Sequence, residues 1–402
     1  MASAVAPSTP AAPISTAPAS SMLQRPPRLL SLDFMRGLIM VLLALESAGL
    51  YEHLTADSEN TFLHPFFLQF SHHRWHGLHA WDLVQPAFMF MAGAAMAFSL
   101  HRQQQEARTW NYSFRKALKR SGWLFFWGVL DYAVRPGGLS FELWDVLTQL
   151  SFTCLVAFLI FRWSVTAQIA VCVALLLLTE ILYRFTHVPG FDQPFTDQHN
   201  FGNYVDLLLM NKINDGGWVA INCIPTAVHT IGGVLAGKLL LGDNAPAAAP
   251  TPTQTTTPAT SAQKTKTLVL WGLIALVLGY ALDLAGITPI IKRIATSSFT
   301  LVSLGYALLI LAGCYWWIDV RDHRRRLKFF TIVGMNSIFI YLFFEIVGDR
   351  WFTGYVGAVT NGLMQFAHIP IVVQGIVTSC CVFGLEWGLC YFLYRKKIFF
   401  RV

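Results

Sequence analysis

Residues 165–185 read VTAQIAVCVALLLLTEILYRF, and the first charged side chain in this stretch is Glu180. A run of about 20 apolar residues is long enough to cross the hydrocarbon core of a bilayer as an α-helix. Similar runs recur along the 402-residue chain, in which 54% of residues are hydrophobic and only 13% are charged. Soluble domains carry about 25% charged residues, so the composition excludes an ordinary soluble enzyme and a disordered protein. The sequence predicts an all-α, polytopic protein in a lipid bilayer.

Ten transmembrane helices are predicted, of which the fourth is the shortest. They cover about 35–52, 81–100, 119–134, 146–161, 165–185, 218–241, 266–286, 298–318, 329–347 and 371–394. Two segments rich in Ala, Pro, Ser and Thr, 1–27 and 243–265, are predicted to be a disordered tail and a disordered cytoplasmic linker. The linker separates the first part of the membrane domain, 28–242, from the second, 266–402, without creating two independent domains.

The positive charges predict the orientation. With the N-terminus in the cytoplasm, 22 of the 29 Lys and Arg residues fall on the cytoplasmic side and seven on the other. Cytoplasmic loops carry such an excess, so both termini are expected in the cytoplasm. This asymmetry also explains the net charge of +7 without nucleic acid. The composition of the tail and the lack of a signal-peptide pattern favour a bacterial inner membrane.

Histidines concentrate in the predicted outer loops, which are 53–80, 135–145, 186–217, 287–297 and 348–370. These loops hold nine of the twelve histidines, and six lie in the first loop, just before and within the stretch 72–93, HHRWHGLHAWDLVQPAFMFMAG. Three interpretations compete. The loop is merely solvated, or His72, His76 and His79 bind a metal, or one imidazole is a general base, since its ordinary pKa of ~6.5 suits proton transfer near neutral pH. Interruptions by Gly and Trp and the absence of a nearby Cys weaken the metal interpretation.

Two carboxylates lie at a depth where they could orient such a base. Asp82 stands at the start of the second span, where a carboxylate caps free backbone N–H groups, so it is either a helix cap or a partner of the base. Glu46 lies near the outer end of the first span. A carboxylate there faces the bundle interior or a wet cavity, and it either pairs within the bundle or holds the imidazole.

Several motifs resemble those of the heparan-α-glucosaminide N-acetyltransferase family. Residues 28–50, RLLSLDFMRGLIMVLLALESAGL, resemble its R-x-x-S-(L/V)-D-x-x-R-G opening, and residues 72–93 resemble its H-x-x-W-x-G-L-x-x-x-D-L-V-x-P segment. Weaker similarities follow in the family's order at 202–210 (GNYVDLLLM), 215–240, 289–301 (PIIKRIATSSFTL) and 334–341 (GMNSIFIY). The resemblance covers about residues 28–345.

The resemblance implies a polytopic acetyltransferase. Such an enzyme takes acetyl from cytoplasmic acetyl-CoA and transfers it to an amine or hydroxyl of a sugar or glycan on the outer face. The family's essential histidine falls on His72, and the Asp of D-L-V-x-P falls on Asp82. A family Asn near the end of the first span falls on Glu46, which cannot donate a hydrogen bond when ionised. His72 would act as a base or carry the acetyl group itself.

The acetyl-CoA phosphates need cationic partners on the cytoplasmic side. The basic loops 101–120 and 321–328 are the candidates, and the predicted donor-binding residues are Arg36, Arg115, Lys119, Arg324 and Asn336. These cations could instead serve topology and lipid headgroups alone, and Asn336 could bond a neighbouring helix instead of lining an acyl tunnel. No metal is expected, and a homodimer is considered. The alternative function is a multi-span transporter or channel, which predicts paired broken helices in two related halves.

Overall fold

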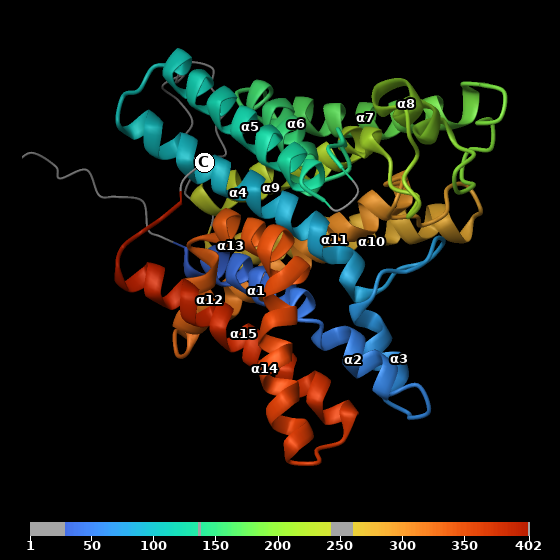
Figure 1. Ribbon diagram of the computed structural model, residues 1–402. Coiled ribbons are helices and arrows are strands. Elements are labelled where there is room, and N and C mark those ends of the chain that lie inside the picture. Colours follow the sequence, from blue (N-terminus) through green and yellow to red (C-terminus); the bar gives the residue numbers. More distant parts are fainter. Residues whose placement is uncertain (1–28, 136–137, 243–259, 401–402) are drawn as a thin grey trace, which may run out of the picture.

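The structure is a computed structural model that describes residues 29–135, 138–242 and 260–400. The predicted tail, 1–27, and most of the predicted linker lie outside the described residues, and the linker prediction runs too far because Ser261 already begins a helix. The secondary structure of the described residues consists of helices joined by loops (Figure 1), with a single isolated bridge between His76 and Ile291. The α-helices are α1 (Leu30–Ser47), α2 (Leu50–Asp57), α3 (His64–Phe67), α4 (Val84–Gln105), α5 (Trp110–Ala133), α6 (Val146–Leu159), α7 (Val165–Phe185), α8 (Phe201–Met210), α9 (Cys223–Leu241), α10 (Ser261–Leu284), α11 (Ser297–Cys314), α12 (Leu327–Gly334), α13 (Ser337–Phe343), α14 (Thr353–Phe366) and α15 (Ile371–Arg395). Short 3₁₀ turns η1 (Leu68–Phe70), η2 (Ala80–Leu83) and η3 (Ala220–Asn222) and π turns η4 (Tyr315–Val320) and η5 (Phe344–Phe352) connect or extend them.

Six helices are long and apolar enough to cross a membrane: Ala80–Gln105, Val165–Phe185, Ala220–Leu241, Ser261–Leu284, Ser297–Val320 and Ile371–Arg395. Two bent pairs raise the number to eight if each pair is one span. Of the remaining predicted spans, α6 is apolar but has only 14 residues, and α5 carries four basic residues in its first half. All ten predicted segments are thus helical, the structure supports six to eight spans, and the count of ten stays a prediction.

Contacts between the helix ends agree with the predicted sidedness. Predicted outer segments bond one another, as the Trp75 indole does to the Phe195 carbonyl at 2.7 Å. Predicted inner segments do the same, as Lys264 Nζ does to the Leu240 carbonyl at 2.7 Å. Both contacts join segments that are predicted to lie on the same side of the membrane. The assignment of one side to the cytoplasm rests on the charge count.

The bundle is built around α4 and α9. In α9, 72% of the apolar window is buried inside the protein, and 56% in the segment that contains α4. Glycines let the two backbones touch: a Cβ on Gly93 would lie 1.9 Å from the Thr230 carbonyl oxygen, and one on Gly233 would lie 1.9 Å from the Phe90 carbonyl oxygen. Small residues of this kind allow the close helix approach that membrane proteins use.

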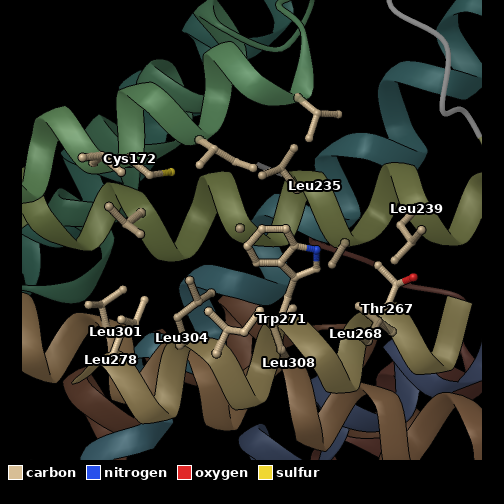
Figure 2. Close-up of a pocket in the computed structure, with 18 of the residues that line it drawn as sticks. Cys172, Leu235, Leu239, Thr267, Leu268, Trp271, Leu278, Leu301, Leu304 and Leu308 are labelled. Atoms are coloured by element: carbon tan, nitrogen blue, oxygen red, sulfur yellow. The ribbon is translucent and has the colours of Figure 1, made fainter. Parts of the chain in front are cut away.

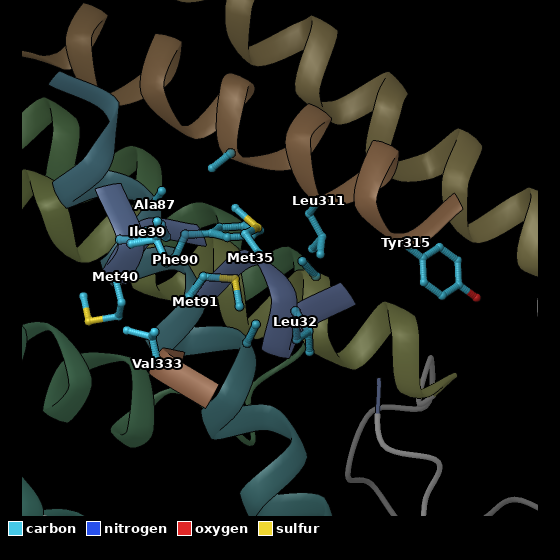
Figure 3. Close-up of a cluster of buried hydrophobic side chains, with 14 of the residues drawn as sticks. Leu32, Met35, Ile39, Met40, Ala87, Phe90, Met91, Leu311, Tyr315 and Val333 are labelled. Atoms are coloured by element: carbon cyan, nitrogen blue, oxygen red, sulfur yellow. The ribbon is translucent and has the colours of Figure 1, made fainter. Parts of the chain in front are cut away.

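An apolar cluster packs α1 onto α4, α11 and α12 (Figure 3). Its buried members include Leu32, Met35, Ile39 and Met40 on α1, Phe90 and Met91 on α4, Leu311 on α11 and Val333 on α12. The α1–α12 contact is again at backbone distance, since a Cβ on Gly37 would lie 2.1 Å from the Phe330 carbonyl oxygen.

Two of the predicted spans are broken. The chain bends by 65° between α1 and α2, where Gly49 has a φ of 75°, and by 75° between α12 and the helical stretch that begins at Ser337. The segment 348–370, predicted as an outer loop, contains a helix, α14 (Thr353–Phe366). Its apolar, uncharged sequence folds back on α15, with Thr360 and Thr378 hydroxyls 2.7 Å apart. Figure 1 shows α2, α3 and α14 projecting from the main body of helices.

Candidate active site

A single buried carboxylate organises the histidine loop. The side chain of Asp82 is fully buried. Its Oδ2 accepts hydrogen bonds from the backbone N–H of His73 at 3.2 Å and of His79 at 2.9 Å, and its Oδ1 lies 3.0 Å from His72 Nδ1. Asp82 therefore does both things that the sequence offered as alternatives: it caps the turn that starts the second span and holds the imidazole of His72.

Lys292 completes this group from a distant part of the chain. Its Nζ lies 3.0 Å from His72 Nδ1 and 3.5 Å from Asp82 Oδ1, and the residue is only 6% exposed. The loop that carries it is tied to the histidine loop by a bond from the Gly77 N–H to the Ile290 carbonyl, 2.9 Å. The Lys292 amine also lies 5.1 Å from the centre of the Trp218 ring, which stabilises a cation.

The neighbouring charges set the protonation of the two bases. The pKa of His72 is lowered, first by the loss of water around the ring and then by the positive charge of Lys292, against the opposing effect of Asp82. Burial lowers the pKa of Lys292 to about 8, although Asp82 and Glu46 favour its charged form. A histidine with a lowered pKa is neutral near pH 7, and a neutral imidazole is the form that accepts a proton.

His72 opens on a cavity of about 270 Å³ at the outer end of the bundle. The cavity is lined by Leu43, Glu46, His72, Trp81, Val84, Gln85, Phe88, Tyr132, Arg135, Trp144, Asp145, Val146, Trp218, Lys292, Tyr341 and Glu345. Nδ1 of His72 faces Asp82 and Lys292, whereas Nε2 makes no hydrogen bond within the described residues. Nε2 is therefore the nitrogen available to a bound molecule.

The wall opposite His72 is also polar. The Tyr341 hydroxyl donates to Asp145 Oδ2 at 2.8 Å, and Arg135 lies 3.8 Å from Glu345 and stacks 3.6 Å from the centre of the Tyr132 ring. Burial raises the pKa of Asp145 to about 7. This wall presents hydrogen-bond donors and acceptors together with aromatic faces, the combination that binds a polar organic molecule with hydroxyl or amino groups.

The weaker motif of residues 202–210 supports one of these aromatic faces. Asp206 Oδ2 accepts from the Trp144 indole N–H at 3.0 Å, and Asp206 Oδ1 accepts from the Ala220 N–H at 2.9 Å. Burial raises the pKa of Asp206 to about 7. Asp206 thus joins α8 to η3, the turn that precedes α9, and fixes the orientation of Trp144 in the cavity wall.

Glu46 lies in the cavity, and its contact differs from the one expected. Its Oε1 accepts from the Trp81 indole N–H at 3.0 Å. The atom that faces His72 Nδ1 belongs to Asp82, so Asp82 and not Glu46 is the carboxylate that orients the imidazole. Glu46 lies on α1, in a different element from Asp82, and its carboxylate adds negative charge near Lys292.

The other histidines of the loop make contacts away from His72. His76 Nε2 lies 2.8 Å from Asp283, and His79 Nδ1 lies 3.0 Å from the Ser71 carbonyl oxygen. Within residues 29–135, 138–242 and 260–400, no group of three His, Cys, Asp or Glu side chains is placed to hold a metal ion. The histidine spacing that suggested a metal site therefore serves separate contacts.

The predicted donor-binding residues lie at the other end of the bundle and do not form one cluster. Arg115 and Lys119 are exposed on α5, and Arg36 lies 4.0 Å from Asp33 on α1. Arg324 pairs with Asp322 and lines a separate cavity of about 580 Å³. That cavity is lined by Phe34, Gly313, Cys314, Trp317, Ile318, Asp322, His323, Arg324, Arg325, Arg326, Leu327 and Phe330.

Asn336 has a structural contact at the break between α12 and α13. Its amide group donates to the Ile398 carbonyl at 3.0 Å, and its Oδ1 accepts from the Phe400 N–H at 3.0 Å. Both ends of this buried amide therefore hold the segment that follows α15. Neither cavity described above is lined by Asn336.

The sequence reasoning missed most of the wall opposite His72. Arg135, Asp145 and Tyr341 are not among the site residues predicted from the sequence, and Lys292 enters there only as one of the seven Lys and Arg residues on the outer side. Two signals were present, because Tyr341 ends the GMNSIFIY motif and Lys292 lies in PIIKRIATSSFTL. Arg135 and Asp145 carry no motif, and only the fold brings them to the cavity.

Comparison with known proteins finds a distant relative. No family model matches the chain. The chain is 25% identical over 450 residues to human heparan-alpha-glucosaminide N-acetyltransferase, and the similarity covers 94% of this chain. It covers 60% of the relative, so this chain spans about 60% of the relative's length. The extent of the similarity supports a distant relationship to that N-acetyltransferase.

Proposed function

We propose that this protein is a transmembrane acetyltransferase that moves acetyl from cytoplasmic acetyl-CoA to an amine or hydroxyl of a sugar or glycan on the outer face. The observation that supports it most is the trio of His72, Asp82 and Lys292 at the edge of a polar cavity. The trio combines a neutral base, a carboxylate that orients it and a neighbouring cation. The distant similarity to an N-acetyltransferase supports the same reaction class.

In the proposed reaction, His72 Nε2 accepts the proton of the attacking amine or hydroxyl. The acceptor's lone pair forms a bond to the acetyl carbonyl carbon, and the carbon–sulfur bond of the thioester breaks. Coenzyme A leaves as a thiolate, which takes up the proton that His72 received, so the products are the acetylated acceptor and free coenzyme A. Asp82 holds the imidazole with Nδ1–H toward Oδ1, which keeps Nε2 unprotonated until the attack.

A second route passes through an acetylated histidine. There Nε2 attacks the thioester itself, coenzyme A leaves, and the acceptor then takes the acetyl group from the imidazole. The contact of Nδ1 with Asp82 fits both routes, because both use Nε2.

The donor would enter at the cavity of about 580 Å³ beside Arg324, Arg325 and Arg326. Guanidinium groups bind phosphates in pairs of hydrogen bonds, and coenzyme A carries several phosphates. The two cavities touch the same helix at Phe34 and Leu43. At 1.5 Å per residue these positions are about 13 Å apart along α1, which is the distance that the acetyl end of the donor would have to cover.

The test is a sided assay in liposomes. Purified protein is reconstituted with labelled acetyl-CoA on one side of the membrane and glucosamine as the probe acceptor on the other. We expect acetylated acceptor from the wild type and at least a 100-fold lower rate from His72→Ala, since a general base contributes about 10²–10⁴-fold. His64→Ala is the matched control, because His64 lies in the same loop, contacts Ser58 and Thr55, and does not line the cavity.

Three results would contradict the proposal. Acetyl transfer at the normal rate by His72→Ala would show that His72 is not the base. Cysteine labelling that places residue 72 on the same side as both chain ends would rule out the transmembrane route. Solute uptake by the liposomes without any transfer of acetyl would favour the transporter alternative.

A further inference from the structure

Helices α7 and α10 form a wedge on the lipid-facing side of the bundle. They are its most peripheral spans, with 11% and 22% of their apolar windows buried, against 72% for α9 between them. Their outer ends are joined, because Arg184 bonds the Ile287 carbonyl and Thr288 Oγ1 donates to Glu180 at 3.1 Å. Toward their inner ends the two helices enclose a cavity.

This cavity has a volume of about 360 Å³ and an almost entirely apolar lining. α9 and α11 form its floor, with Leu235, Leu239, Leu301, Leu304 and Leu308, and α7 and α10 form its walls, with Cys172, Trp271 and Leu278. Figure 2 shows these side chains around one space, with the indole ring of Trp271 projecting into it. Trp271 is 48% exposed, so the cavity is open to the surrounding lipid at this wall.

The packing of α10 explains why the cavity exists. α10 contacts α11 at backbone distance, since a Cβ on Gly279 would lie 2.8 Å from the Ser298 carbonyl oxygen and one on Gly305 would lie 2.8 Å from the Gly272 carbonyl oxygen. These glycines draw α10 toward α11 and away from α7. No side chain of the described helices fills the space that results.

The length of the cavity corresponds to one leaflet of a bilayer. Its lining on α10 runs from Thr267 to Leu278, which is about 17 Å at 1.5 Å per residue. The hydrocarbon core of a bilayer is roughly 30 Å thick, so the cavity spans about half of it. The Thr267 end is the end that the charge count assigns to the cytoplasm.

Basic residues surround the cytoplasmic end. Lys238 lines the cavity itself. Its ammonium bonds the Phe161 carbonyl. Lys264 donates to the Leu240 carbonyl at 2.7 Å, so its ammonium lies at the end of α9, and the exposed Lys266 follows two residues later. Ammonium groups at the level of the lipid headgroups attract phosphate.

We propose that this wedge binds one anionic phospholipid of the cytoplasmic leaflet, with an acyl chain in the cavity and the phosphate beside Lys238 and Lys264. The cavity is apolar, and such cavities exclude water but accept hydrocarbon. The site is separate from the cavity at His72 and does not depend on the proposed acetyl transfer.

The test is native mass spectrometry of protein purified in detergent and depleted of bulk lipid. We expect the wild type to retain about one phospholipid per chain. Cys172→Trp fills the cavity from the α7 wall and should lower the retained fraction at least fivefold. Leu177→Trp is the matched control, because Leu177 lies on the same helix, is 56% exposed and does not line the cavity. Equal retention by the two variants, or retention of detergent in place of phospholipid, would overturn the proposal.

The headgroup preference is tested by competition. Wild type incubated with equal amounts of phosphatidylglycerol and phosphatidylcholine should retain the anionic lipid several-fold more often. The double variant Lys238→Gln with Lys264→Gln should lose that preference while keeping the total bound. A preference that is unchanged in the double variant would refute the assignment of the phosphate to these lysines.

A second measurement does not rely on a variant whose side chain fills the cavity. Phospholipid with brominated acyl chains quenches tryptophan fluorescence on contact, and Trp271 lies inside the proposed site. The difference in quenching between wild type and Trp271→Phe should saturate at about one lipid per chain. A difference that keeps growing in proportion to added lipid would show that Trp271 meets only bulk lipid.

Discussion

Replacing Lys292 by Met gives the sharpest test of the electrostatics at the candidate site. The substitution keeps the length of a buried, 6% exposed side chain and removes its charge. Lys292 Nζ lies 3.0 Å from His72 Nδ1, and a cation at that distance disfavours a second positive charge on the ring. Its removal also leaves the Asp82 carboxylate to act on His72 alone. Both changes favour the protonated imidazole, so we expect the pKa of His72 to rise.

The size of the rise follows from Coulomb's law. Two unit charges about 4 Å apart interact by about 1 kcal/mol in water and about 4 kcal/mol at the effective dielectric constant of a protein surface. The His72 side chain is 37% exposed to the cavity, and water there screens the interaction toward the lower figure. About 1.4 kcal/mol corresponds to a rise of about one pKa unit.

The assay is the pH dependence of acetyl transfer. The acid limb of kcat/KM reports the pKa of the base in the free enzyme, so in Lys292→Met it should move upward by about one pH unit. Above a pH of about 8, where Lys292 of the wild type loses its own proton, the electrostatic difference should vanish. Lys212→Met is the control, since Lys212 lies on the same side and pairs with Glu142. An acid limb that stays in place, or moves downward, would refute the reasoning.

Three further predictions concern other parts of the chain. Asp82→Asn should lower the transfer rate at least about 100-fold, because it removes the charge that holds the base. It should also lower the thermal unfolding midpoint, because the same side chain accepts hydrogen bonds from two backbone N–H groups. An unchanged rate would contradict the role of Asp82 as the partner of His72. Gly93→Ala should destabilise the protein by about 1–3 kcal/mol, since the new Cβ would meet the Thr230 carbonyl, and denaturant unfolding would measure the loss. Arg324→Gln should raise KM for acetyl-CoA about threefold with kcat unchanged, whereas Arg102→Gln, outside the cavity, should not; equal KM values would place donor binding elsewhere.

The apolar runs predicted the helices well because their signal is local. Residues 165–185 were expected as a span and form α7 with the same limits. The breaks were not expected, since the bend after α1 depends on one residue, Gly49, whose φ of 75° cannot be read from hydropathy. α14 was not expected either, because Gly354, Gly357, Asn361 and Gly362 interrupt its apolar sequence and are poor helix formers.

The candidate site was predictable in part. His72 and Asp82 lie ten residues apart in one motif, so the sequence could suggest that they meet, and they do at 3.0 Å. Asp82 and Glu46 lie at nearly the same depth in the membrane domain, so the sequence could not tell which carboxylate contacts the imidazole. That choice depends on the direction in which each side chain points. Lys292 comes from 220 positions further along the chain, and its contact with His72 follows only from the packing of the 287–296 loop against the histidine loop.

The residues that line the cavity at His72 come from both parts of the membrane domain. Glu46, His72 and Asp145 precede the segment 243–259, whereas Lys292 and Tyr341 follow it, and all five line one cavity. The Tyr341 hydroxyl bonds Asp145, and the Lys292 amine contacts His72, so each wall of the cavity contains residues from both parts. Neither part alone would enclose the cavity or place a cation beside the base. We infer that residues 28–242 and 266–402 act as one unit, and that cutting the chain within 243–259 should preserve transfer only if the two fragments stay associated.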